Sequence, residues 1–148
     1  MDVQYFDCRI GAICFILSRD QALQIIDFHG DEDLQRRIEE LAEKANEGEL
    51  QIEHILPRKH GGSDDLANLA LACIDSNLHK GANLTGINPE TGRVIELFNP
   101  RSQRWSEHFA WTECPVVGLT AAGRTTIRVL DINAEDRIRV RLAEASIT

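Results

Sequence analysis

The chain has 148 residues, of which 43% are hydrophobic and 27% charged. This length suits a single domain with its own core, and the composition excludes a wholly disordered, collagen-like or coiled-coil protein. The net charge of −8 argues against tight nonspecific binding to nucleic acid. However, 12 acidic and five basic residues lie in residues 1–50, so residues 51–148 are close to neutral. Arginines in that later part remain candidates for contact with phosphate.

The chain lacks the features of an exported or membrane protein. Four cysteines are too few for a disulfide scaffold. The longest apolar run, Ile10–Leu17, spans eight residues and contains Gly11, whereas a membrane helix needs about 20. The segment 1–7 carries two aspartates and no basic residue, which does not fit a signal peptide. We therefore expect a cytoplasmic protein without a membrane partner.

The first third of the sequence predicts one helix. Residues 9–17 fit either a strand or the start of a buried helix. Asp31 is a typical helix N-cap, apolar residues then recur at helical spacing, and Gly48 stands where a helix ends. These features predict a helix over 31–47, within an N-terminal extension covering 1–49.

The next part predicts a strand, a long loop, a second strand and a helix. Residues 50–56 alternate apolar with polar until Pro57, which is typical of a strand. A loop rich in glycine and aspartate occupies 61–65, and 66–73 alternates again. Asp75 or Ser76 would cap a short helix over 77–82.

The remaining residues add further short elements. We expect a turn at 88–92, a strand at 94–98, a helix at about 121–131 and a last helix capped by Asn133. Three aromatic residues are expected to belong to the core rather than to a base-stacking surface: Trp105, Phe109 and Trp111. The chain therefore predicts an α+β fold, with a core over 50–111 and a C-terminal helical segment over 112–148.

Four residues in the strand-loop-strand-helix unit suit the chemistry of a metal-dependent nuclease. They are Glu53, His54, Asn68 and Asn77. A neutral imidazole can take a proton from water, and carboxylate and carboxamide oxygens suit a hard cation. Successive side chains of a strand point in opposite directions, so a twist or bulge would be needed to bring Glu53 and His54 to one phosphate.

The full motif resembles that of the HNH endonuclease family, also called ββα-metal or His-Me finger nucleases. The matching residues are Glu53-His54-Ile55-x-Pro57, Gly61-Gly62, Asn68-Leu69, Cys73 and Asn77-x-x-Lys80-Gly81, with asparagine at the third position of the pattern. A tail signature between residues 97 and 120 resembles a bacterial subgroup of small stand-alone HNH proteins. The resemblance covers about residues 50–145.

The resemblance implies a role for each matched residue. His54 matches the general base that activates water, and Asn68 matches the asparagine that ties the loop together and orients this histidine. Glu53 and Asn77 match the protein ligands of one divalent ion, usually Mg²⁺, with Mn²⁺ as another candidate.

The resemblance also implies a substrate and a fold. DNA is the expected partner, with RNA left open, and Arg58 and Lys80 would contact neighbouring phosphates. The implied fold is a ββα-metal finger with an N-terminal helical extension and C-terminal helices. The implied reaction is hydrolysis of phosphodiester bonds.

A structural zinc ion, which many HNH relatives bind through two C-x-x-C pairs, is not expected. Cys73 is followed at the partner position by Ser76, and no such pair precedes the motif. Five residues separate Cys8 from Cys14. The alternative is a zinc site assembled from these three cysteines and His79. Otherwise His79 is expected, like His60, to be a surface residue.

Two other functions compete with the nuclease. A catalytically inactive HNH-like module that binds nucleic acid or protein is favoured by the net charge and the missing zinc cysteines. The intact Glu53, His54 and Asn77 argue against it. A DNA mimic that uses the acidic first third is the third candidate.

Overall fold

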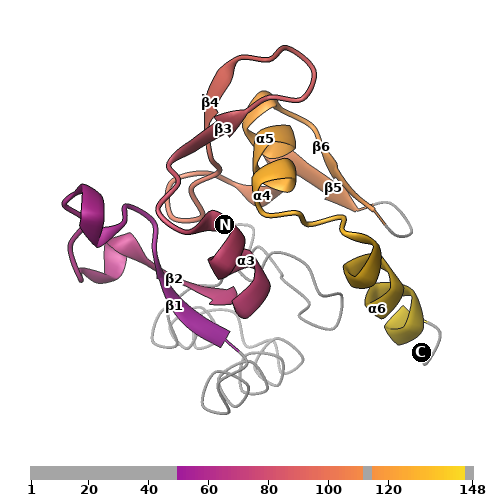
Figure 1. Cartoon of the computed structure of the whole chain (residues 1–148), viewed down its shortest axis with the longest axis horizontal. Helices are drawn as coiled ribbons and strands as arrows, with labels where there is room; N and C mark the ends of the chain where they lie inside the picture. The colour runs from indigo at the N-terminus through magenta and orange to yellow at the C-terminus, as the bar shows by residue number, and fades with distance from the viewer. Residues whose placement is uncertain (1–49, 112–114, 146–148) are drawn as a thin grey trace, which may run out of the picture.

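The computed structural model describes residues 50–111 and 115–145. The segment 9–17 and the helix expected over 31–47 lie outside the described residues. Within the described ranges the protein has the predicted α+β fold, with three two-stranded antiparallel sheets and several short helices (Figure 1). None of the described helices is long and apolar enough to cross a membrane.

The first sheet is a hairpin of β1 (Leu50–His54) and β2 (Leu69–Cys73). The pairing is regular along the whole of β1 and ends with His54 opposite Leu69. Because no extra residue interrupts the ladder, Glu53 and His54 point to opposite faces of the hairpin.

Two turns of 3-10 helix shape the loop between these strands, η2 (Arg58–His60) and η3 (Leu66–Asn68). The strand predicted over 66–73 therefore begins three residues later than expected. The chain then passes directly from β2 into α3 (Ile74–Lys80). The helix predicted over 77–82 was placed too late, since the chain needs no separate capping turn between β2 and α3.

The second sheet lies beyond α3 and pairs β3 (Thr85–Ile87) with β4 (Val94–Glu96) across the predicted turn. Helix α5 (Ala121–Val129) is capped by Thr120, whose side chain accepts a hydrogen bond from the Gly123 amide. In Figure 1 this helix lies directly beneath the β3–β4 hairpin.

The third sheet joins the two parts into which the sequence was divided. A short helix, α4 (Trp105–His108), leads into β5 (Phe109–Trp111), which pairs with β6 (Val116–Gly118). Because β5 belongs to the segment 50–111 and β6 to the segment 112–148, the two segments share a sheet.

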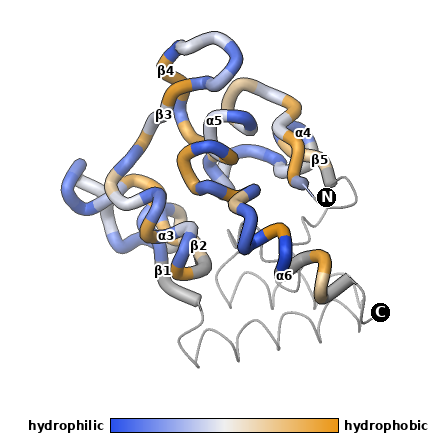
Figure 2. Tube along the Cα trace, turned by 45° about the vertical axis from the view of Figure 1, so that its right-hand side comes forward, coloured by the Kyte–Doolittle hydropathy of each residue, from blue (hydrophilic) through white to orange (hydrophobic). Residues whose placement is uncertain are grey.

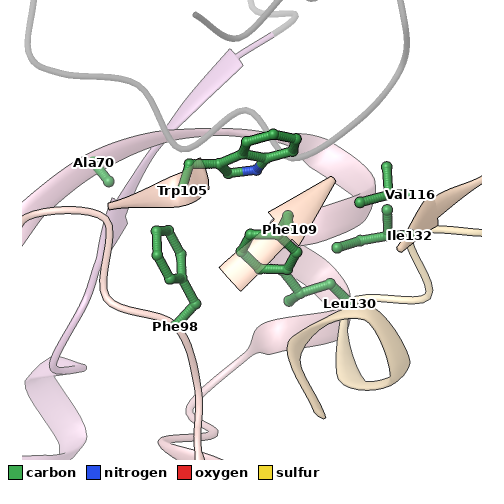
Figure 3. Close-up of a cluster of buried hydrophobic side chains, with 7 residues drawn as sticks. All are labelled: Ala70, Phe98, Trp105, Phe109, Val116, Leu130 and Ile132. Carbon is green, nitrogen blue, oxygen red and sulfur yellow. The ribbon is translucent and has the colours of Figure 1, made fainter. Parts of the chain in front are cut away.

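A single cluster of buried side chains connects these elements (Figure 3). Phe109 lies near its centre, with its ring centroid 5.5 Å from that of Trp105 and 5.1 Å from that of Phe98. Other members include Ala70, Val116, Leu130 and Ile132. The prediction that Trp105 and Phe109 belong to the core is confirmed, whereas the side chain of Trp111 lies outside the described part of the structure. Because Ala70 lies on β2, this core also supports the first hairpin.

The last helix, α6 (Glu135–Ala145), is attached to α3 through a buried arginine. Arg137 donates to the Ser76 hydroxyl at 2.8 Å and to the carbonyl oxygens of Leu130 at 2.7 Å and Asp131 at 3.1 Å. Asn133, expected to cap α6, instead bonds both backbone groups of Val116. It lies one residue too early for a cap.

We predict that Arg137→Met lowers the free energy of unfolding by about 1.5–3 kcal/mol, the usual value for hydrogen bonds to a charged group. Arg139 lies on the same helix, is exposed and pairs with Glu135. Arg139→Met should therefore cost only about 0.3–0.5 kcal/mol, and methionine keeps the helix propensity of arginine in both variants. Chemical denaturation monitored by circular dichroism measures both. Equal losses would contradict the structural role of Arg137.

Candidate active site

A buried ion pair joins the end of β1 to the end of α3. Lys80 Nζ lies 2.6 Å from Glu53 Oε1 and 3.1 Å from the backbone oxygen of His54, and it donates a hydrogen bond to each. The exposed fractions are 6% for Glu53 and 5% for Lys80. Buried charges of this kind are tolerated only when they are paired and hydrogen-bonded. The pair therefore holds the backbone at His54 in place against α3.

This pairing directs both charged groups to the interior. Lys80, predicted to contact phosphate, points toward β1 and uses two of its three donors there. Glu53, predicted to bind a metal ion, has one carboxylate oxygen held by Lys80. Lys80 would have to leave both partners to meet a phosphate.

His54 points to the other face of the hairpin and meets a carboxylate of the loop. Its Nε2 lies 2.7 Å from Asp64 Oδ1, and the same oxygen accepts hydrogen bonds from Arg58 Nε at 3.1 Å and Nη2 at 2.8 Å. The hydrogen bond with His54 and then that from Arg58 hold the pKa of the Asp64 carboxyl below its usual range. The side chain of His54 is 22% exposed and that of Asp64 66%.

Asn68 closes the loop that carries Asp64. Its Nδ2 donates to the carbonyl oxygens of Leu56 at 2.9 Å and Ser63 at 2.8 Å, and its Oδ1 accepts from the Leu56 amide at 2.8 Å. Gly62 allows this close approach, since a Cβ there would lie 1.7 Å from the Leu56 oxygen. The loop path therefore depends on Asn68 and Gly62 together.

Asn77 lies on α3, one turn before Lys80 and partly buried. It therefore belongs to the helix that closes over the Glu53 side of the hairpin. Within residues 50–111 and 115–145, no group of three or more histidine, cysteine, aspartate or glutamate side chains is arranged to hold a metal ion. The predicted ligands thus offer two kinds of oxygen donor, carboxylate and carboxamide, without a third side chain.

The loop beside His54 presents an exposed basic segment. Arg58, Lys59 and His60 form η2, and all three are exposed. His60 Nε2 lies 3.2 Å from the Ala82 carbonyl oxygen, which attaches this loop to the end of α3. Both His60 and His79 are exposed, as predicted. The loop is drawn largely in the hydrophilic colour in Figure 2.

Two polar residues of the tail signature hold the structure together. Arg101 Nε donates to the Leu69 carbonyl oxygen at 2.7 Å, on the β2 residue opposite His54. His108 Nδ1 lies 2.6 Å from the Oγ1 of Thr120, the N-cap of α5. The tail signature is thus joined to the β1–β2 hairpin at Leu69, the residue paired with His54.

Sequence reasoning missed Asp64, which it assigned to a turn-rich loop. Asp64 lies ten residues after His54, and no spacing rule links a strand-end histidine to a carboxylate in an irregular loop. The only available signal was the pair of aspartates at 64 and 65, separated from the paired glycines by Ser63.

Comparison with known protein families finds a match for part of the chain. The family model of the HNH endonucleases matches residues 41–83, a range that contains β1, the loop, β2 and α3. No curated protein and no solved structure matches the chain significantly. The match covers the candidate site from Glu53 to Lys80, and it confirms the resemblance seen in the motif. Residues 41–83 of this chain are therefore similar to the HNH endonucleases.

Proposed function

We propose that this protein is a metal-dependent endonuclease that hydrolyses phosphodiester bonds of DNA, with His54 as its general base. The observation that carries the proposal is the setting of His54 inside the HNH-family segment. Its backbone is held by Lys80, and its partly exposed ring is hydrogen-bonded to a carboxylate. In this proposal β1, β2 and α3 form the ββα-metal finger of a core over 50–111, in a cytoplasmic protein.

His54 would act on the attacking water. The imidazole takes a proton from the water as its oxygen bonds to phosphorus, and the bond from phosphorus to the leaving 3′ oxygen breaks. A rigid hairpin suits this role, because a general base must stay within hydrogen-bond reach of one water molecule. The His54–Leu69 pairing and the Lys80 hydrogen bond supply that rigidity.

The donor set of the site suits a hard divalent cation. We propose Glu53 and Asn77 as ligands of one Mg²⁺, or Mn²⁺ in its place, with Asn68 supporting the loop. When bound, the ion would stabilise negative charge on the phosphate and the leaving oxygen. Mg²⁺ often keeps several waters and uses few protein ligands. Since Lys80 holds one oxygen of Glu53, we expect weak binding in the absence of DNA.

Within the described part of the loop beside His54, Arg58 and Lys59 are the basic side chains that we propose to contact DNA phosphates. Both are exposed on η2, next to the loop that meets His54. Such contacts are electrostatic and independent of sequence, and they apply equally to RNA. Lys80 remains a proposed phosphate contact only for a state in which it leaves Glu53.

We predict that His54→Ala lowers the rate of plasmid nicking by ~10²–10⁴, the usual share of a general base. His60→Ala, which removes an exposed histidine six residues away, is the matched control and should keep most of the activity. The assay follows conversion of supercoiled plasmid to nicked and linear forms with Mg²⁺, and a parallel reaction with EDTA should show no cleavage. Undiminished cleavage by His54→Ala would refute the assignment.

A second prediction separates metal binding from structural support at Glu53 and Asn77. Asn77→Ala and Glu53→Gln should reduce cleavage at low Mg²⁺ and regain part of it as Mg²⁺ is raised, because a lost ligand weakens binding of the ion. Thermal melting of each variant is the control. If Glu53→Gln melts earlier and its cleavage does not respond to Mg²⁺, Glu53 serves only as the partner of Lys80.

A third prediction is that the purified protein carries no stoichiometric zinc. A closed structural site needs four ligands in a tetrahedral arrangement. Ser76, at the position of a second cysteine, is buried and accepts a hydrogen bond from Arg137. Cys8, Cys14 and Cys114 lie outside the described residues. Elemental analysis after dialysis checks this prediction, and about one zinc per chain would contradict it.

The second candidate is an inactive HNH-like binding module. The buried Glu53–Lys80 pair favours it, because it occupies the carboxylate that would otherwise bind the metal ion. Wild-type protein that binds plasmid or a protein partner but cleaves no DNA in Mg²⁺ or Mn²⁺ would support this candidate over the nuclease.

A further inference from the structure

We propose that Asp64 is a positioning residue for His54, holding the imidazole in the tautomer whose Nδ1 is free to accept a proton. The inference rests on the proposed function for its catalytic consequence, but its structural part can be measured without any nuclease activity. Asp64 acts through His54 and is not placed in contact with the substrate.

The chemistry of the pair fixes the tautomer. An ionised carboxylate can only accept hydrogen bonds, so the 2.7 Å contact requires a hydrogen on His54 Nε2. A neutral imidazole carries only one ring N–H, which leaves the lone pair of Nδ1 available. Within the part of the chain that the structure describes, no hydrogen bond reaches Nδ1. His54 thus has one nitrogen anchored and one open, as a general base requires.

Arg58 keeps Asp64 in the state and the orientation that this role needs. Two nitrogens of its guanidinium meet the same Oδ1 that faces His54. Their positive charge favours the ionised carboxyl. Because Asp64 is two-thirds exposed, it would otherwise be free to turn toward solvent. The arginine therefore limits this freedom through the same oxygen that meets His54.

Asn68 supports the same arrangement from inside the loop. It donates to the carbonyl oxygen of Ser63, the residue directly before Asp64, at 2.8 Å. Ile55, directly after His54, donates its amide hydrogen to the Asn68 carbonyl oxygen at 2.9 Å. Asn68 thus connects the two backbone segments that carry the histidine and its carboxylate, which gives a physical route by which it orients His54.

The chain offers a matched control one residue away. Asp65 carries the same charge in the same loop, but its carboxylate accepts from Ser63 Oγ and does not meet His54. Asp64→Ala and Asp65→Ala change the net charge equally, so their general effects on DNA binding are similar. A difference between them reports on the contact with His54.

We expect Asp64→Ala to lower kcat for plasmid nicking about 10- to 100-fold relative to Asp65→Ala, the loss found for carboxylates that orient metal-binding histidines. KM should change equally in both variants, and Asp64→Glu should regain part of kcat. In a His54→Ala background, Asp64→Ala should have no further effect, since it acts through the histidine. Equal kcat values for Asp64→Ala and Asp65→Ala would overturn the proposal. Recovery of Asp64→Ala by added Mg²⁺ would also overturn it, because it would make Asp64 a metal ligand.

Nitrogen NMR of ¹⁵N-histidine-labelled protein tests the pair independently of activity. In the neutral ring of the wild type, Nε2 should be protonated and Nδ1 unprotonated. Asp64→Ala should give a mixture of tautomers, and Asp65→Ala should leave the His54 signals unchanged. A neutral wild-type ring with Nδ1 protonated would refute the inference. If the wild type does not cleave DNA but shows the expected tautomer, the proposed function fails while the Asp64–His54 contact stands.

Discussion

The buried ion pair between Glu53 and Lys80 is the constraint on which the candidate site depends. Two buried charges are stable only while they satisfy each other and their remaining hydrogen bonds. Lys80 does so by bonding both the Glu53 carboxylate and the His54 backbone. One ammonium group therefore joins the last turn of α3 to the last two residues of β1. Any movement of the helix away from the strand would leave a buried charge without its partner.

Because side chains alternate along β1, Glu53 and His54 lie in different surroundings. Since Glu53 faces α3, His54 must face the opposite side, where it meets the loop. The inner side is charged and buried, and the outer side is exposed, with Arg58 and Asp64 beside the imidazole. A histidine that acts as a general base needs both a fixed backbone and an imidazole that is accessible to water. The regular β1–β2 ladder supplies them from neighbouring residues, but it lacks the bulge that would bring Glu53 and His54 to the same face of the hairpin.

The sequence predicted the regular elements better than the contacts of the site. Alternation over 50–56 and the Gly61-Gly62 turn located the hairpin and its loop. The strands β3 and β6 are only three residues long, too short for periodicity to detect. The Asp64–His54 contact was not predictable, because the loop path depends on the contacts of Asn68 with Leu56 and Ser63 and on the lack of a side chain at Gly62. Contacts between residues that are distant in the chain produce no recognisable spacing of residues in the sequence.

Ser76 shows how the same helix can be held without a metal ion. It follows Cys73 at the spacing of a zinc-binding pair, yet its hydroxyl is buried and accepts a hydrogen bond from Arg137. The guanidinium also bonds the carbonyl oxygens of Leu130 and Asp131 just before α6. A metal ion would tie α3 to a neighbouring loop, whereas Arg137 ties it to the C-terminal helix. Helix α3 is thus supported at two places, near its start by α6 through the Arg137–Ser76 hydrogen bond and at its end by β1 through the Lys80–Glu53 ion pair. The stability of the C-terminal helix and the position of His54 are consequently linked through a single short helix.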